Sequence, residues 1–258
     1  MEPVAGHDVV RIRADNPGPF TLSGTNTWVV GRDPCWVIDP GPLLDDHLET
    51  IARAVAERGG AGGIALTHDH ADHAEAVPAL RERLGAEVAA SRWQGADRSI
   101  ADGDAVGPLL AIATPGHAPD HLAFVWEGVC FSGDAVLGEG SVFVAPDPGA
   151  LRGYLAALDR LRELPLDAIC PGHGPVVDDP RAKVEQYIAH RLDRERRLVA
   201  ALDDGLRAHD ELLDRVWDDA PPALRGAATV TLAAHLDKLA EEGRLPEGVS
   251  RPAFRDLG

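Results

Sequence analysis

Thr67-His68-Asp69-His70-Ala71-Asp72-His73 decides the fold of this chain, because it sets four potential metal ligands within six positions after an apolar strand. In extended backbone, residues two apart point the same way, so His68 and His70 can converge on one cation. A helix that begins near Ala71 places Asp72 and His73 in its first turn, facing a second position close by. Because imidazole and carboxylate are both good zinc ligands, the spacing predicts two adjacent zinc ions. Such a pair activates a bridging water for attack on an ester, amide or phosphate.

Three more polar side chains each end an apolar run that has the pattern of a buried strand. His117 follows residues 109–116, Asp134 follows residues 129–133, and His173 follows residues 168–172. A glycine immediately before each of them permits a sharp turn of the backbone. Ligands at the ends of strands in a rigid sheet converge better than ligands scattered on loops. We therefore predict seven metal ligands, which are His68, His70, Asp72, His73, His117, Asp134 and His173.

These motifs resemble the signature of the metallo-β-lactamase superfamily, H-x-H-x-D-H followed by separate His, Asp and His motifs. Within the superfamily the sequence is most similar to the β-lactamase-like protein 2 subfamily. The similarity is carried by Asn16–Thr27, Gly133–Gly140 and Cys170–Pro175, and it runs from about Asn16 to the C-terminal helices. The resemblance implies an αββα sandwich with the metals in a cleft along the sheet edges.

The resemblance also implies how the ligands divide between the two ions. The first zinc would be held by His68, His70 and His117, the second by Asp72, His73 and His173, and Asp134 would bridge them. We expect Asp72 and Asp134 to be the catalytic residues, because they offset part of the metal charge and can orient a metal-bridging hydroxide. Iron or manganese remains an alternative to zinc.

Differences from other branches of the superfamily narrow the range of activities that we expect for this chain. True zinc β-lactamases commonly place Cys in the second metal site, whereas the position here is Asp134 and no Cys is available nearby. Residues 137–141 replace the Gly-Cys-Gly-Arg stretch of glyoxalase II and persulfide dioxygenases, and Leu137 replaces a Tyr of acyl-homoserine lactonases. His70 replaces a Glu of flavodiiron proteins. We expect Cys130 and Cys170, which lie inside apolar runs, to be buried thiols.

The order of elements indicates an α/β (α+β) chain with a catalytic domain over residues 1–180. Two β-rich halves with interspersed helices favour two sheets packed face to face, with helices outside. We expect helices over residues 43–58, 71–84 and 149–164. The expected strands are residues 28–30, 35–38, 64–67, 87–90, 109–114, 121–127, 129–133 and 167–170.

Residues 181–258 form an all-helical pattern that resembles a winged-helix module. We expect helices over residues 181–202, 206–217, 224–230 and 231–242. The last of these would be the recognition helix, but it carries one Lys against three acidic residues, so we interpret it as a substrate lid or packing element and expect no DNA binding. The mixed-charge run Arg191–Arg197 has the spacing of i,i+4 pairs and is expected on a solvated face.

The net charge of −17 is concentrated in the catalytic domain. Residues 1–180 contain 12 basic and 27 acidic residues, whereas residues 181–258 contain 13 and 15. Because nucleic-acid affinity rests on Lys and Arg contacts to phosphates, the catalytic domain is a poor general binder of polyanions. No apolar stretch is long enough to span a membrane and no signal peptide is visible. Three cysteines with no paired spacing fit reduced thiols, so we expect a cytoplasmic protein without membrane partners.

Three functions follow. The first is a zinc-dependent hydrolase of a small ester or thioester, which the acidic surface and the aliphatic lid favour. The alternative is a single-stranded RNA endonuclease, which the subfamily resemblance implies. A scaffold that has lost chemistry is disfavoured by the complete ligand set. We expect His121 to orient a ligand, and Asn26 and Thr27 either to line the cleft or to cap a turn. The sequence indicates neither the acyl group nor an oligomeric state.

Overall fold

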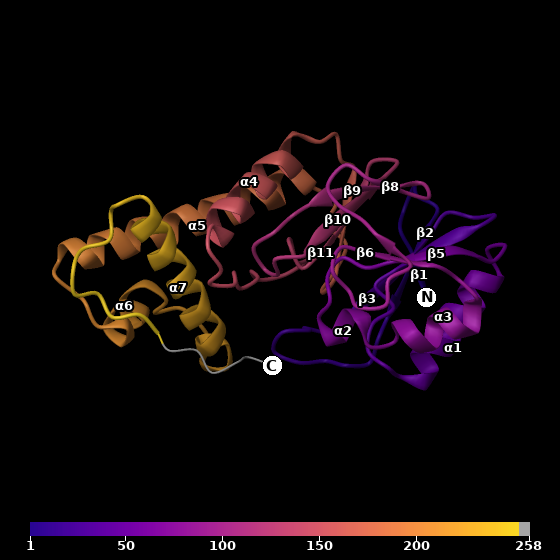
Figure 1. The fold of residues 1–258 in the computed structure, drawn as a ribbon, viewed down its shortest axis with the longest axis horizontal. Coiled ribbons are helices and arrows are strands. Elements are labelled where there is room, and N and C mark those ends of the chain that lie inside the picture. The colour runs from indigo at the N-terminus through magenta and orange to yellow at the C-terminus, as the bar shows by residue number, and fades with distance from the viewer. Residues whose placement is uncertain (253–258) are drawn as a thin grey trace.

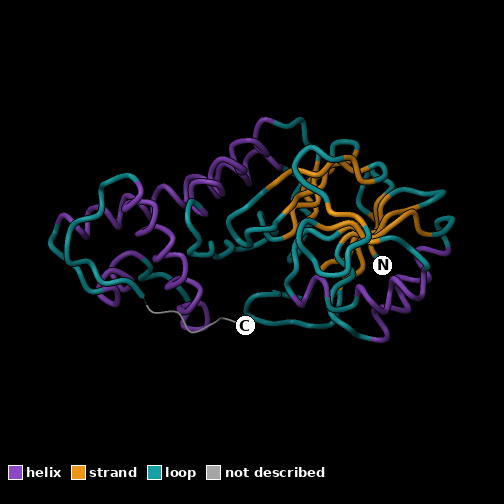
Figure 2. The backbone as a smooth tube through the Cα atoms, in the orientation of Figure 1, coloured by secondary structure: helices purple, strands orange, loops and turns teal. Residues whose placement is uncertain are grey.

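The computed structural model describes residues 1–252, in which two β-sheets pack face to face between layers of helices (Figures 1 and 2). The first sheet has the strand order β1-β2-β3-β4-β5-β6-β7, and the second has the order β12-β11-β10-β9-β8. The strands of the first sheet are Glu2–Pro3, Val9–Arg13, Asn26–Val30, Cys35–Ile38, Ala61–Ala65, Val88–Ala90 and Arg98–Ser99. Those of the second, from β8 to β12, are Ala105–Val106, Leu109–Ala113, Leu122–Trp126, Val129–Gly133 and Ala168–Pro171.

Parallel pairing of strands in both sheets positions the site. In the first sheet the pairs β4–β5, β5–β6 and β6–β7 are parallel, and in the second β11 is parallel to β12, whereas the other neighbours are antiparallel. The carboxyl ends of parallel strands meet at one edge of a sheet. The segments that follow β5, β11 and β12 carry three of the predicted ligand motifs, so the topology gathers them at neighbouring edges.

The core is layered as the sequence predicts. Large side chains such as Trp28, Phe124 and Phe131 are buried between the sheets. Helices α1 (Asp45–Ala56), α2 (Ala71–Ala74) and α3 (Val77–Leu84) lie against the first sheet, where Ile51 and Leu80 are buried. Helices α4 (Ala150–Glu163) and α5 (Pro180–Asp203) cover the outer face of the second sheet. The αββα sandwich is confirmed.

The C-terminal helices form a second core beside the sandwich. Helix α5 continues beyond the sheets and packs against α6 (His209–Val216), while α7 (Arg225–Glu241) packs against both α6 and α4 (Figure 1). A 3-10 turn over Pro222–Leu224 leads into α7. Because α5 contributes to both cores, the boundary at residue 180 stays a prediction. Within residues 1–252, no helix combines the length and the apolar character needed to cross a membrane.

Several expected elements were wrong in extent. The helix expected over residues 71–84 is divided into α2 and α3, because Pro78 lacks an N–H and occupies the first turn of a new helix. The two helices expected over residues 224–242 are the single helix α7, since no glycine or proline interrupts residues 227–241. Strand β2 was not predicted, because two arginines break up its short apolar pattern.

The expectation of a solvated face for Arg191–Arg197 was wrong for two of its members. Arg191 is 2% exposed and Arg194 is 6% exposed, whereas Arg196 and Arg197 lie at the surface or close to it. The helical spacing that predicts i,i+4 pairs also points one face of α5 inward, toward the end of α6 and the loop before α4. Burial of these two arginines is therefore a finding that charge pattern alone does not reveal.

Candidate metal centre

All seven predicted ligands converge in the structure, from loops and helix starts that follow the strands. His68 and His70 lie between β5 and α2, and Asp72 and His73 are in the single turn of α2. The other three, His117, Asp134 and His173, lie just after β9, β11 and β12. Their donor atoms form three overlapping groups in which every donor lies within 4.8 Å of the others in its group.

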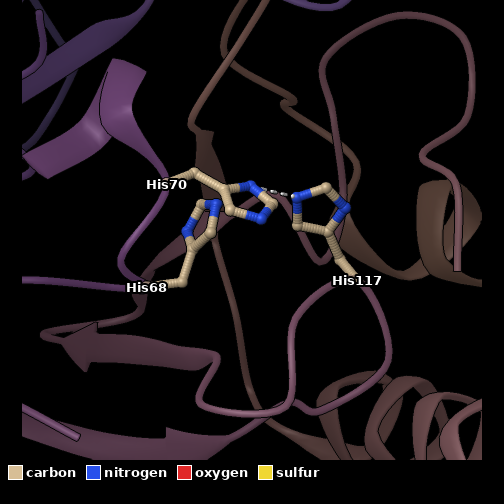
Figure 3. A group of neighbouring side chains, drawn as sticks. All are labelled: His68, His70 and His117. Carbon is tan, nitrogen blue, oxygen red and sulfur yellow. Dashed lines mark hydrogen bonds between the residues drawn. The ribbon is translucent and has the colours of Figure 1, made fainter. Parts of the chain in front are cut away.

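The first group comprises His68, His70 and His117, whose rings gather at one point (Figure 3). His117 Nε2 lies 3.0 Å from His70 Nδ1. His117 Nδ1 is 3.3 Å from the carbonyl oxygen of Phe143, which leaves Nε2 directed at the group. His68 Nδ1 is 2.9 Å from the hydroxyl of Thr67. Three imidazoles with one nitrogen turned inward are a donor set suited to zinc.

The second group comprises Asp72, His73 and His173. His73 Nε2 lies 3.3 Å from His173 Nε2, and Asp72 Oδ2 lies 3.2 Å from His173 Nε2. Asp134 stands between the two groups, with Oδ2 3.4 Å from His173 Nε2 and 3.6 Å from His117 Nε2. Its carboxylate therefore reaches donors of both groups.

The electrostatics of the two groups differ. Burial lowers the pKa of His117 to about 4 and lowers the pKa of His68 well below its usual range, so both rings are neutral and free to bind metal. Burial acts in the same direction on His173, but the carboxylates of Asp134 and Asp72 outweigh it and raise its pKa to about 10. Two carboxylates that draw a proton onto a buried ring mark a place that favours positive charge.

The residues present fit divalent cations. His68 Nε2 and Asp134 Oδ1 are buried and have no hydrogen-bond partner among residues 1–252. Buried polar atoms rarely lack partners, and both residues belong to the groups above, whose donor atoms lie close enough to hold a metal. The backbone also approaches closely, since a Cβ on Gly172 would lie 2.5 Å from Asp134 Oδ1. A side chain at that position would fill the space beside the ligand.

A second layer of residues supports the ligands, and sequence reasoning missed its main member, Asp39. Its carboxylate accepts hydrogen bonds from the backbone N–H and the hydroxyl of Thr67, both at 2.8 Å. Asp39 Oδ2 also lies 2.9 Å from His73 Nδ1. A carboxylate behind a histidine ligand fixes the ring orientation and its tautomer. The signal was present, because Asp39 ends an apolar strand just as Asp134 does.

His121 has the arrangement of an orienting residue. Its Nε2 accepts a hydrogen bond from the backbone N–H of Asp134 at 3.0 Å, and its Nδ1 is 2.7 Å from the hydroxyl of Thr114. Both ring nitrogens are thus engaged. Burial lowers the pKa of His121 well below its usual range, so the ring is neutral.

Asn26 and Thr27 neither cap a turn nor line the cleft. Asn26 is fully buried, and its Nδ2 donates to the carbonyl oxygens of Pro171 at 3.0 Å and Gly174 at 2.9 Å. These carbonyls flank His173, so Asn26 holds the loop that presents this ligand. The Thr27 hydroxyl donates to the carbonyl oxygen of Asp39 at 2.7 Å and supports the residue behind His73.

A cavity of about 320 Å³ opens from the metal ligands toward the C-terminal helices. His117 and Asp134 form one end of its lining, and α5, α7 and the turn between α6 and α7 form the other. Apolar side chains dominate its wall, which includes Phe20, Leu22, Leu137, Val142, Phe143, Trp217 and Leu224. Sequence reasoning anticipated an aliphatic lid but not a chamber shared between the two cores.

Known proteins show the same two parts. A family model described as the metallo-beta-lactamase superfamily matches residues 91–173, and one described as the beta-lactamase associated winged helix domain matches residues 209–248. A Caenorhabditis elegans protein named beta-lactamase-like protein 2 homolog is 32% identical over 259 residues, covering 91% of this chain and 85% of the relative. An Aspergillus chevalieri protein named atrochrysone carboxyl ACP thioesterase is 35% identical over 258 residues, covering 95% of this chain and 77% of the relative.

The fold has a counterpart among solved structures. The crystal structure of a metallo-beta-lactamase family protein from Thermus thermophilus matches with a TM-score of 0.75 and 24% sequence identity. The match covers 92% of this chain and 94% of that one, so it includes both the sandwich and the C-terminal helices.

Proposed function

This chain belongs to the metallo-β-lactamase superfamily of hydrolases, and on that premise we propose that it hydrolyses small acyl thioesters, or related esters, with two zinc ions. The observation that carries the proposal is the chamber of about 320 Å³ that joins His117 and Asp134 to an apolar wall. An apolar cavity beside the donor groups suits an acyl chain better than a strongly solvated phosphodiester strand. The thioesterase name of the Aspergillus chevalieri relative supports this choice of substrate.

In this proposal His68, His70 and His117 would hold the first ion, Asp72, His73 and His173 would hold the second, and Asp134, which lies beside donors of both groups, would contribute to both sites. Zinc bound in this way supplies Lewis acidity and lowers the pKa of water toward neutrality. Asp72, whose side chain is 31% exposed, is accessible to a water molecule and can accept its proton. Hydrolysis then replaces the C–S bond of the thioester with a C–O bond from water, releasing a carboxylic acid and a thiol.

The side chains around the donors position the substrate. Trp217, Leu224 and Phe143 form an apolar wall that holds the acyl chain, so the carbonyl carbon lies toward Asp134. The same wall excludes bulk water, which strengthens electrostatic interactions within the chamber. Helix α7 contributes to this wall and is largely buried along its middle, from Ala228 to Leu239, which fits a packing and lid role.

A substrate panel tests the proposal. Purified zinc-loaded protein is assayed with N-acetylcysteamine thioesters of two to eight carbons and with labelled single-stranded RNA. We expect thioester turnover that is insensitive to salt and that Asp72→Ala abolishes. Trp217→Ala should raise KM about 10-fold for the longer acyl chains and leave acetyl turnover unchanged, because one large apolar contact is lost.

RNA cleavage is the rival outcome. It would fall steeply with salt, because phosphate contacts release counterions, and replacing Arg196 and Arg197, at or near the surface, with Ala would weaken it. RNA cleavage that disappears in Asp72→Ala, without turnover of any thioester, overturns the proposal.

A further inference from the structure

Arg191 is a buried cation without an anionic partner. Its side chain is 2% exposed, yet within residues 1–252 no carboxylate oxygen lies within 4.0 Å of its guanidinium nitrogens. It donates to the carbonyl oxygen of Val142 through Nη2, and its Nε is buried with no hydrogen-bond partner. The guanidinium carbon lies 5.6 Å from the ring centroid of Tyr154. Arginine stays protonated in proteins, so this charge is desolvated, and no carboxylate among residues 1–252 neutralises it.

The neighbouring cations on the same helix faces are neutralised. Arg194, one turn along α5, donates to both carboxylate oxygens of Asp219 at 2.7 Å. Lys238 of α7 pairs with Glu195 at 2.8 Å and with Glu242 at 2.7 Å. The contrast is local, since Arg194 and Glu195 lie on the same helix, α5, as Arg191. Among residues 1–252, the lack of an acidic partner is therefore a property of the Arg191 position and not of the whole helix.

The histidine and tyrosine side chains beside Arg191 carry no negative charge that would compensate it. Burial, reinforced by Arg191 and Arg194, lowers the pKa of His190 to about 4. Burial and the charges of Arg191 and Lys238 lower the pKa of His235 well below its usual range. Both imidazoles are neutral. Tyr154 keeps its proton, because burial raises its pKa to about 12, and its hydroxyl donates to the carbonyl oxygen of Ala135 at 2.6 Å.

Arg191 also lines the chamber that contains His117 and Asp134. Resting on the proposed thioesterase function, we propose that Arg191 binds an anionic group of the substrate and selects thioesters that carry one. The planar guanidinium presents a fork of N–H donors that matches a carboxylate or phosphate bidentately. An apolar wall with one unpaired cation favours a ligand that has an apolar stem and one anionic end. The other end of that ligand, the thioester carbonyl, lies toward Asp134.

Two sources can supply such an anion, a carboxylate at the far end of the acyl chain or a phosphate on the thiol carrier. Three matched substrates separate them. Glutaryl-N-acetylcysteamine has the acyl carboxylate and no phosphate, pentanoyl-N-acetylcysteamine has neither, and pentanoyl-coenzyme A has only phosphates. Wild type, Arg191→Gln and the surface control Arg196→Gln, on the same helix, are compared by kcat/KM on all three.

We expect wild type to prefer one anionic substrate over the neutral one, and Arg191→Gln to lose about 10- to 100-fold of that preference, as for charge-assisted hydrogen bonds. The neutral substrate should change less than about 3-fold, since it offers the guanidinium no anion. A merely structural role would lower all three rates together and leave the ratios intact, which overturns the inference. Loss of the glutaryl preference identifies the acyl carboxylate, and loss of the coenzyme A preference identifies the carrier phosphate. If Arg191→Gln does not fold, Arg191→Met fills similar volume without a buried charge and carries the same comparison.

A binding measurement separates this inference from the proposed function. Isothermal titration compares glutaramate with pentanamide, which differ only in the distal carboxylate, and coenzyme A with N-acetylcysteamine, on the zinc-loaded wild type and the Arg191 variant. An affinity ratio of about 10 or more in wild type that falls to near 1 in the variant supports anion binding even if no thioester is hydrolysed. Equal affinities within both pairs in wild type overturn it, even if thioesters are hydrolysed.

Discussion

His73 Nδ1 lies 2.9 Å from Asp39 Oδ2, and both side chains are buried. Asp39 follows β4 and His73 lies in α2, so this contact ties a strand end of the first sheet to the ligand helix. The opposite ring nitrogen, Nε2, then faces the donors of the second group. A hydrogen bond on one side of the ring thus sets the direction of the lone pair on the other.

Replacing Asp39 should weaken metal binding without removing a ligand. Asp39→Ala leaves His73 free to rotate and leaves the N–H of Thr67 without its acceptor, so we expect roughly a 10- to 100-fold loss of zinc affinity. Competition titration against a chromogenic chelator measures the change. Asp69→Ala provides the matched control, because Asp69 is exposed within the same motif. Equal affinities for the two variants would sink the idea.

Metal content tests the arrangement of the two donor groups. Protein reconstituted with zinc and then dialysed should hold about two ions per chain. Asp134 reaches both groups, so Asp134→Ala should lower the content toward one, with the three-histidine group keeping its ion. Elemental analysis of the purified variants gives the answer. A fully active wild type with a single ion would contradict the dinuclear proposal.

His121→Ala should act through Asp134. The substitution removes the acceptor for the backbone N–H of Asp134 and frees the loop after β11, so we expect metal affinity or turnover to fall about 10- to 100-fold. His209→Ala, on a half-buried helix start away from the centre, should change neither. If His121→Ala instead abolished binding at one group completely, His121 would have to be a ligand.

Gly172→Ala should damage the site by steric contact alone. The added Cβ would stand 2.5 Å from Asp134 Oδ1 and 2.7 Å from His73 Cε1, so at least one ligand must move. A misplacement of about 1 Å at an active site can lower turnover about 100-fold, and we expect a loss of that order. Gly226→Ala, in a helix with no atom within 4 Å of the new Cβ, should leave turnover unchanged and keep the protein folded. Unchanged kcat/KM in Gly172→Ala would show that the backbone has room to shift.

The convergence of the candidate ligands was predictable because their motifs follow regular signals. An apolar strand, a turn residue and then a metal-binding side chain is a local pattern, and it occurs before Asp134 and His173 in adjacent sequence. Asp39 also follows an apolar strand, but no other potential metal ligand lies near it in the sequence, so its supporting role was not predicted. Its role depends on the parallel pairing of β4 with β5, which brings it to Thr67, and pairing of strands is a tertiary property.

The chamber was less predictable, because its wall comes from distant parts of the chain. Phe20, Phe143 and Trp217 become neighbours of one space only when α5 is placed against the sandwich. Arg191 shows why the burial of a wall residue could not be predicted from the sequence. Within the run Arg191–Arg197 every arginine looks equally polar, and only the packing of α5 against the loop holding Val142 decides which of them is buried.

The candidate metal ligands and part of the chamber wall lie in different segments of the sequence. All seven candidate metal ligands precede Pro180, whereas Arg191, Trp217 and Thr231 lie in the C-terminal segment after it. Substitutions in that segment can alter the shape of the chamber, and therefore the ligands that fit it, without moving the candidate metal ligands at the sheet edges. A chain built in this way can change its substrate by altering one terminal segment, with the chemistry inherited intact from the other.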